Sequence, residues 1–144
     1  MTAHILLVDD DENDVFFMTE AFRKAGVQKK IHIAKDGRAA VDYLRSSSEQ
    51  GADGPHLIIL DLKLPFVMGL DVLRCIRSEL GLLTVVIIMS ASAEKSDVAA
   101  AYRGGANAYL VKPSDTGKLT DIVKSIDAFW LNQNTFAARE EHAV

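Results

Sequence analysis

The sequence predicts an α/β fold in which a doubly wound parallel sheet of five strands carries helices on both faces. Five short apolar runs recur along the 144 residues, and each is too short to form a typical helix. Between them lie segments whose apolar residues repeat at helical spacing. Because strands and helices alternate, parallel strands joined by right-handed helical crossovers are expected.

The predicted strands are nearly continuous runs of apolar residues, rich in Ile and Val. They cover residues 5–8 (ILLV), 31–34 (IHIA), 57–60 (LIIL), 84–89 (TVVIIM) and 108–111 (AYLV). A strand with one solvated face would alternate apolar and polar residues along its length. These runs largely lack that alternation, which indicates strands that are covered on both faces.

Five helices are predicted between and after these strands, at residues 12–25, 37–45, 69–80, 94–104 and 116–130. The fourth is Ala-rich and stops at Gly104 and Gly105, a pair that favours a helix end. Acidic residues at 11, 12 and 14 are assigned to the loop and first turn of the first helix, where the helix dipole favours them.

The polar stretch SSSEQGADGP at 46–55 is expected to be a loop. We expect one domain over residues 1–130, followed by a tail at 131–144.

Composition restricts the class of protein. The net charge of −4 argues against a nucleic-acid surface, and no run reaches the ~18 apolar residues of a membrane span. The N-terminus lacks the basic start of a signal peptide. Cys75 alone cannot form an internal disulfide, which fits a reducing compartment. We therefore expect a cytoplasmic protein that binds neither nucleic acid nor membrane.

Polar side chains follow four of the predicted strands. Asp9 and Asp10 come after the first strand and Asp61 after the third. Ser90 follows the fourth, and Lys112 follows the fifth. Each has an ordinary structural explanation, since Asp and Ser often cap helices and lysine is usually solvated. However, ligands bind at the carboxyl edge of such sheets, and all five residues fall at that edge. The sequence therefore predicts a functional site there.

The chemistry of this predicted site favours a metal and a phosphoryl group. Asp9 and Asp10 have no basic neighbour in the sequence, and clustered carboxylates suit a hard divalent cation such as Mg²⁺. Asp61 is either a further ligand or a nucleophile that forms an aspartyl phosphate. Lys112 and Ser90 favour the nucleophile, because they can neutralise and hydrogen-bond phosphoryl oxygens.

These motifs resemble the receiver domain of two-component response regulators. They are VDD at 8–10, LDLKLP at 60–65, MSAS at 89–92 and VKP at 111–113. The resemblance spans about residues 4–130, and it implies a flavodoxin-like sheet of order 2-1-3-4-5 with five helices. It also implies a cis bond between Lys112 and Pro113, which is uncommon and normally holds a tight turn.

The resemblance assigns a role to each site residue. Asp61 would be the phosphoacceptor, and Mg²⁺ would be held by Asp9, Asp10, Asp61 and the backbone carbonyl of Lys63. Ser90 and Tyr109 would be the switch residues, and Lys112 would contact the phosphoryl group.

The implied reaction is phosphoryl transfer from a sensor histidine kinase to Asp61, which would switch a protein-interaction surface. The protein would then be a signalling phosphoacceptor that catalyses its own phosphorylation and dephosphorylation, rather than an enzyme acting on a separate substrate. ENDVFF at 12–17 and KSIDAFWLNQ at 124–133 are similar to the stand-alone regulators that partner bacterial phytochrome kinases. Lys63 would lie near the path of an attacking water, which predicts slow loss of phosphate.

The sequence leaves open whether the protein forms a homodimer and how it passes on its signal. Trp130, Leu131 and Phe136 either cover the edge of the core or form a homodimer contact. No DNA-binding module is expected after residue 130, so output would be by protein contact, unless the protein only drains phosphate from a kinase.

Three other functions fit the residues less well. A phosphohydrolase would carry a second Asp at position 63, and an FMN binder would need a Ser/Thr/Gly-rich phosphate loop after the first strand. An adaptor that kept only the fold would not need the complete acidic set.

Overall fold

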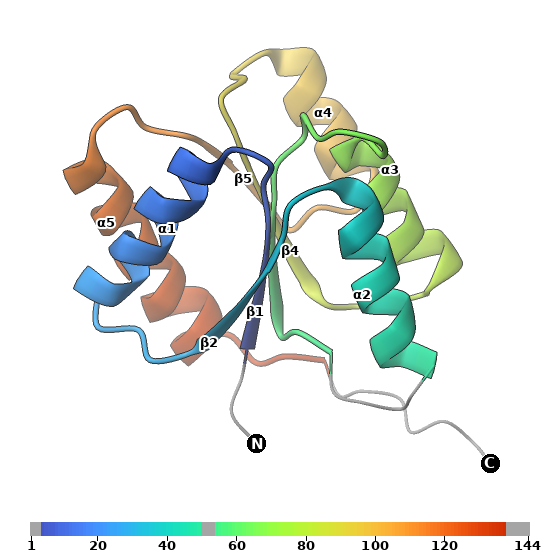
Figure 1. The fold of residues 1–144 in the computed structure, drawn as a ribbon, viewed down its shortest axis with the longest axis horizontal. Coiled ribbons are helices and arrows are strands. Elements are labelled where there is room, and N and C mark those ends of the chain that lie inside the picture. Colours follow the sequence, from blue (N-terminus) through green and yellow to red (C-terminus); the bar gives the residue numbers. More distant parts are fainter. Residues whose placement is uncertain (1–3, 50–53, 138–144) are drawn as a thin grey trace.

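The chain forms a five-stranded parallel sheet between two helical layers, seen in a computed structural model that describes residues 4–49 and 54–137 (Figure 1). The strands are β1 (His4–Val8), β2 (Lys30–Ala34), β3 (Leu57–Leu60), β4 (Val85–Ser90) and β5 (Ala108–Val111). They are hydrogen-bonded in the order β2-β1-β3-β4-β5. The predicted fold class and strand order are both confirmed.

The central strands are buried on both faces, as their continuous apolar runs predicted. In β1, Leu6 and Val8 join one core cluster, whereas Ile5 and Leu7 join the cluster on the opposite face. Successive side chains of a strand point to opposite faces, so a strand between two helical layers needs apolar residues at every position.

Helices α1 (Glu12–Lys24) and α5 (Thr116–Ile126) cover one face of the sheet (Figure 1). The other face is covered by α2 (Gly37–Glu49), α3 (Gly69–Arg74) and α4 (Lys95–Arg103). Two π-helical segments, η1 (Cys75–Glu79) and η2 (Asp127–Gln133), continue α3 and α5 respectively. All five predicted helices are present, and their starts agree with the prediction to within one residue.

Helix α2 is longer than predicted, because residues 46–49 of the expected loop are helical. The hydroxyl of Ser47 donates a hydrogen bond to the carbonyl of Tyr43, one turn earlier (2.9 Å). A serine that bonds back in this way is compatible with a helix and need not end it. Residues 50–53 of the same stretch lie outside the described residues.

The last helical segment ends at Gln133, three residues beyond the predicted end. Trp130, Leu131 and Phe136 are half-buried and pack against the core beneath α1 and α5. These side chains therefore cover the edge of the core, one of the two alternatives that the sequence left open. The domain boundary at residue 130 stays a prediction, and residues 138–144 lie outside the described part. Within the part described, no helix has the length and apolarity that crossing a membrane requires.

Candidate functional site

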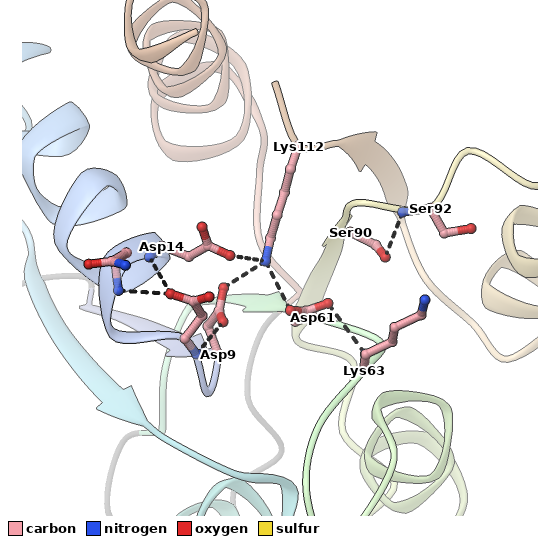
Figure 2. A network of polar contacts seen from close by, with 9 residues as sticks. Asp9, Asp14, Asp61, Lys63, Ser90, Ser92 and Lys112 are labelled. Atoms are coloured by element: carbon pink, nitrogen blue, oxygen red, sulfur yellow. Dashed lines mark hydrogen bonds and ion pairs between the residues drawn. The ribbon is translucent and has the colours of Figure 1, made fainter. Parts of the chain in front are cut away.

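The carboxyl ends of β1, β3, β4 and β5 bring the predicted polar residues to one edge of the sheet. Figure 2 shows Asp9, Asp61, Ser90 and Lys112 around one small region, with Asp61 between Lys112 and Ser90. Asp9 is 5% exposed, Asp61 is 9% exposed and Ser90 is 1% exposed. Buried polar side chains are uncommon unless they are paired, so their concentration here marks the site.

Three carboxylates at this edge form a group that fits a metal ion. One oxygen from each of Asp9, Asp10 and Asp61 lies within 4.8 Å of the others. Asp10 is exposed, whereas the other two are buried, so the group opens to solvent on one side. Carboxylate oxygens and accessible water positions are what hard divalent cations require. The donor set therefore fits the predicted cation.

Lys112 is the basic partner of these acids. Its Nζ lies 2.9 Å from a carboxylate oxygen of each of Asp9, Asp14 and Asp61. Asp9 has no basic neighbour in the sequence, and its basic partner in the fold lies 103 positions away. Even with this ammonium, the four carboxylates of Asp9, Asp10, Asp14 and Asp61 leave an excess of negative charge.

The pKa shifts of Asp9 and Lys112 follow from their burial and from their hydrogen bonds. Burial raises the pKa of Asp9, and hydrogen bonds from Lys112 and from the amide of Asp11 offset this only in part. Burial alone would lower the pKa of Lys112, but its hydrogen bonds to Asp9, Asp61 and Asp14 outweigh that effect and raise the pKa. The lysine is therefore held in its charged form.

Asp14 is a site residue that sequence reasoning missed. The sequence places Asp14 only in the first turn of the following helix, and it does lie there. Asp11 caps α1 by accepting hydrogen bonds from the amides of Asn13 and Asp14, and this fixes the turn beside the end of β5. The signal was available in part, because an acid in the first turn after β1 starts at the same sheet edge as Asp9.

Gly69 is a second residue at the site that the sequence motifs do not identify. A Cβ at this position would lie 2.3 Å from the carbonyl oxygen of Asp61. The amide of Gly69 also donates to the carbonyl of Leu62 (2.9 Å). The loop after β3 therefore folds back onto Asp61 so closely that only glycine fits.

Ser90 is the last residue of β4 and Tyr109 is the second residue of β5, and both are hydrogen-bonded to Ser92. The hydroxyl oxygen of Ser90 accepts a hydrogen bond from the amide of Ser92 (3.3 Å). Tyr109 is half-buried, and its hydroxyl donates to the carbonyl of Ser92 (2.8 Å). A half-buried strand tyrosine with a satisfied hydroxyl needs no further role, so the switch role of Tyr109 stays a prediction.

Lys63 approaches Asp61 from the side away from Lys112. Its amide donates to Oδ1 of Asp61 (3.3 Å), and its ammonium lies on the opposite side of that carboxylate from the Lys112 ammonium (Figure 2). The role of its carbonyl as a metal ligand stays a prediction.

One prediction about the backbone is wrong. The bond between Lys112 and Pro113 is trans, because the described residues contain no cis peptide bond. Trans is the preferred isomer even before proline. The amide of Lys112 reaches the carbonyl of Ser90 (2.8 Å) with this trans bond in place.

A protein-family model and the similar curated proteins identify the same family. Residues 5–124 match the model of the response regulator receiver domain. The chain is 37% identical over 131 residues to the "Probable methanogenesis regulatory protein FilR2" of Methanothrix harundinacea, covering 90% of this chain and 84% of that protein. It is 33% identical over 136 residues to the response regulator Rcp1 of Synechocystis, covering 93% of this chain and 92% of Rcp1.

Solved structures extend the likeness to three dimensions. The phosphorylated cyanobacterial phytochrome response regulator RcpA superposes with a TM-score of 0.87 at 33% identity, covering 96% of this chain and all of RcpA. The Mn²⁺-bound form of Rcp1 gives a TM-score of 0.82 at 32% identity, covering 94% of this chain and 99% of that structure.

Proposed function

The chain belongs to the response regulator receiver domain family, and from this premise we propose that Asp61 accepts a phosphoryl group from a sensor histidine kinase. The observation that supports Asp61 most directly is its placement. It is the buried carboxylate at the carboxyl end of β3, it contacts Lys112, and it lies within the acidic group of Asp9 and Asp10. A nucleophile for phosphoryl transfer needs this combination of charge compensation and limited hydration.

In the proposed step, a carboxylate oxygen of Asp61 attacks the phosphorus of a phosphohistidine. The new O–P bond forms as the P–N bond breaks, and the electron pair stays on the imidazole nitrogen, which takes up a proton. Lys112 holds the Asp61 carboxylate at 2.9 Å and supplies positive charge to a phosphoryl oxygen. Ser90 offers its hydroxyl hydrogen to another oxygen.

We assign the cation site to Asp9, Asp10 and Asp61, together with the carbonyl of Lys63, and the proposed cation is Mg²⁺. The convergence of the three carboxylates supports this assignment, as does the Mn²⁺-bound structure of the relative Rcp1. A bound divalent cation would reduce the repulsion between the Asp61 carboxylate and an anionic phosphodonor. The excess of acids over Lys112 supports the need for such a cation.

The proposed donor is a bacterial phytochrome kinase, because the similar structures include the phytochrome response regulator RcpA. Phosphorylation adds about −1.5 to −2 charges beside Lys112 and Ser90. We propose that this charge draws Ser90 towards Asp61, tightens the contact of Lys112, and so alters the surface formed by β4, β5 and their helices. A homodimer stays a further prediction, which sizing of the phosphorylated and unphosphorylated protein would test.

Intact-mass measurement after incubation with acetyl phosphate and Mg²⁺ tests the proposal. The wild type is expected to gain one phosphoryl group, whereas Asp61→Asn and a sample without divalent cation are expected to gain none. Asp42→Asn serves as the matched control, because Asp42 is an exposed acid on α2 outside the site. If an autophosphorylated phytochrome kinase and acetyl phosphate both failed to label the wild type, the proposed function would be wrong.

A further inference from the structure

Ser92, in the loop between β4 and α4, is bonded through each of its polar atoms to a different part of the molecule. Its amide donates to Oγ of Ser90 (3.3 Å), and its carbonyl accepts from the hydroxyl of Tyr109 (2.8 Å). Its own hydroxyl donates to Oδ2 of Asp97 (2.5 Å) and accepts from the amide of Glu94 (3.2 Å). Figure 2 shows Ser92 beside Ser90 at the edge of the site.

The backbone of Ser92 links the site hydroxyl to the aromatic residue on β5. Because Oγ of Ser90 accepts from the Ser92 amide, the hydrogen of that hydroxyl is left to donate elsewhere. The same residue, through its carbonyl, holds the Tyr109 hydroxyl. A displacement of Ser90 towards Asp61 would therefore act on the residue that holds Tyr109.

The side chain of Ser92 ties this backbone to α4. Asp97 lies in the first turn of α4, and a hydroxyl-to-carboxylate bond of 2.5 Å is short and charge-assisted. The helix also lacks a cap from its own N-cap side chain, since that of Glu94 makes no capping bond. Instead, the Ser92 hydroxyl accepts from the Glu94 amide, so the start of α4 depends on Ser92.

We propose that Ser92 and Asp97 are positioning residues, whose side-chain bond holds α4, Tyr109 and the Ser90 hydroxyl in one arrangement. This inference rests on the proposed phosphorylation of Asp61 for its functional consequence. Its structural part does not depend on that reaction. Breaking the bond is expected to loosen the Ser92 backbone, so that Ser90 is oriented less well and the ring of Tyr109 changes its surroundings.

A double-mutant cycle of Ser92→Ala, Asp97→Ala and the double variant tests the proposal. Ser96→Ala is the matched control, because Ser96 is an exposed serine of the same turn of α4. Ser92→Thr keeps the hydroxyl and is expected to restore wild-type behaviour. The first readout is the NMR signal of the Tyr109 ring in the unphosphorylated protein. The second is the initial rate of phosphorylation by acetyl phosphate.

Each single variant is expected to shift the Tyr109 ring signals and to slow phosphorylation by about fivefold to tenfold, the effect of losing one ordinary intramolecular hydrogen bond. The double variant is expected to be no slower than either single variant. Tyr109 signals that move no more than in Ser96→Ala would overturn the proposal, and so would additive effects of the two substitutions. If the wild type takes no phosphoryl group at all, the proposed function fails. The Tyr109 ring signals would still decide whether the bond between Ser92 and Asp97 positions Tyr109.

Discussion

Helices α1 and α5 on one face of the sheet begin at aspartates that cap them, and so does α2 on the other face, where Asp36 accepts from the amide of Ala39. Helices α3 and α4 on that second face begin at residues whose own side chains do not cap them, although the Ser92 hydroxyl accepts from the Glu94 amide before α4. Asp11 and Asp115 each accept hydrogen bonds from two amides in the first turn of their helix. Met68 and Glu94, at the equivalent positions of α3 and α4, make no capping bond with their side chains. A missing cap typically costs a helix about 1 kcal/mol.

The same contrast appears in the loops around the site. On the α1 side, Lys112 is fixed by Asp9 and Asp14. On the other side, Phe66 in the loop after β3 has φ of 68°, a left-handed conformation that is costly for a residue with a side chain. We infer that the side of the site next to α1 and α5 is rigid and positions the reacting groups. The side formed by the loops before α3 and α4 is less constrained and suited to movement.

Removal of the Lys112 ammonium, which lies on the α1 side of the site, is expected to have the largest effect on the rate of phosphorylation. Lys112→Met is expected to slow phosphorylation by acetyl phosphate by about 100-fold, because an electrostatic contact to the reacting group is lost. Initial rates from intact mass provide the measurement. Lys118→Met makes the same change at an exposed position of α5 and is expected to leave the rate unchanged. An unchanged rate in Lys112→Met would mean that the lysine is only a structural ion-pair partner.

The next largest effect is expected on the unfolding free energy, because the loop after β3 lies very close to the backbone of Asp61. Gly69→Ala is expected to cost about 2 kcal/mol of unfolding free energy, because its Cβ would overlap the carbonyl of Asp61 and the backbone there must shift. Urea unfolding measures the change. Gly54→Ala is the control, since a Cβ there would meet no heavy atom within 4 Å. Equal stability of the two variants would show that the loop moves away from Asp61 without cost.

The capping contrast itself can be tested by changing both sides. Met68→Asp is expected to raise the unfolding free energy by about 1 kcal/mol, and Asp115→Ala is expected to lower it by about 1 kcal/mol. The backbone of Met68 is already extended, as an N-cap requires, and the residue is 51% exposed. Chemical denaturation of both variants gives the comparison. A loss of stability in Met68→Asp would mean that the exposed methionine has a packing role that outweighs a cap.

The smallest expected effect concerns Lys63, on the less constrained side of Asp61. Lys63→Asn is expected to shorten the lifetime of the phosphorylated form a few-fold, because a long cation beside the carboxylate would hinder an attacking water. The decay of the phosphorylated mass after removal of acetyl phosphate measures this lifetime. Lys95→Asn, on exposed α4, controls for the charge change. An identical decay for Lys63→Asn and wild type would remove Lys63 from any account of phosphate loss.

Much of the site could be predicted because its residues follow directly from the strands. Each continuous apolar run identifies a strand buried on both faces, and the residue at its carboxyl end is then placed without knowledge of distant contacts. That reasoning is sufficient for Asp9, Asp61 and Lys112. It is not sufficient for Asp14, whose contact with Lys112 joins residues 98 positions apart.

The sequence by itself determined the alternation of strands and helices and the edge at which the polar residues gather, because both depend on local periodicity. Only the tertiary structure decided which charges pair, so that Lys112 contacts both Asp9 and Asp14. The same holds for the bond between Ser92 and Asp97. These features depend on how separate segments approach one another, and local propensity carries no information about that approach.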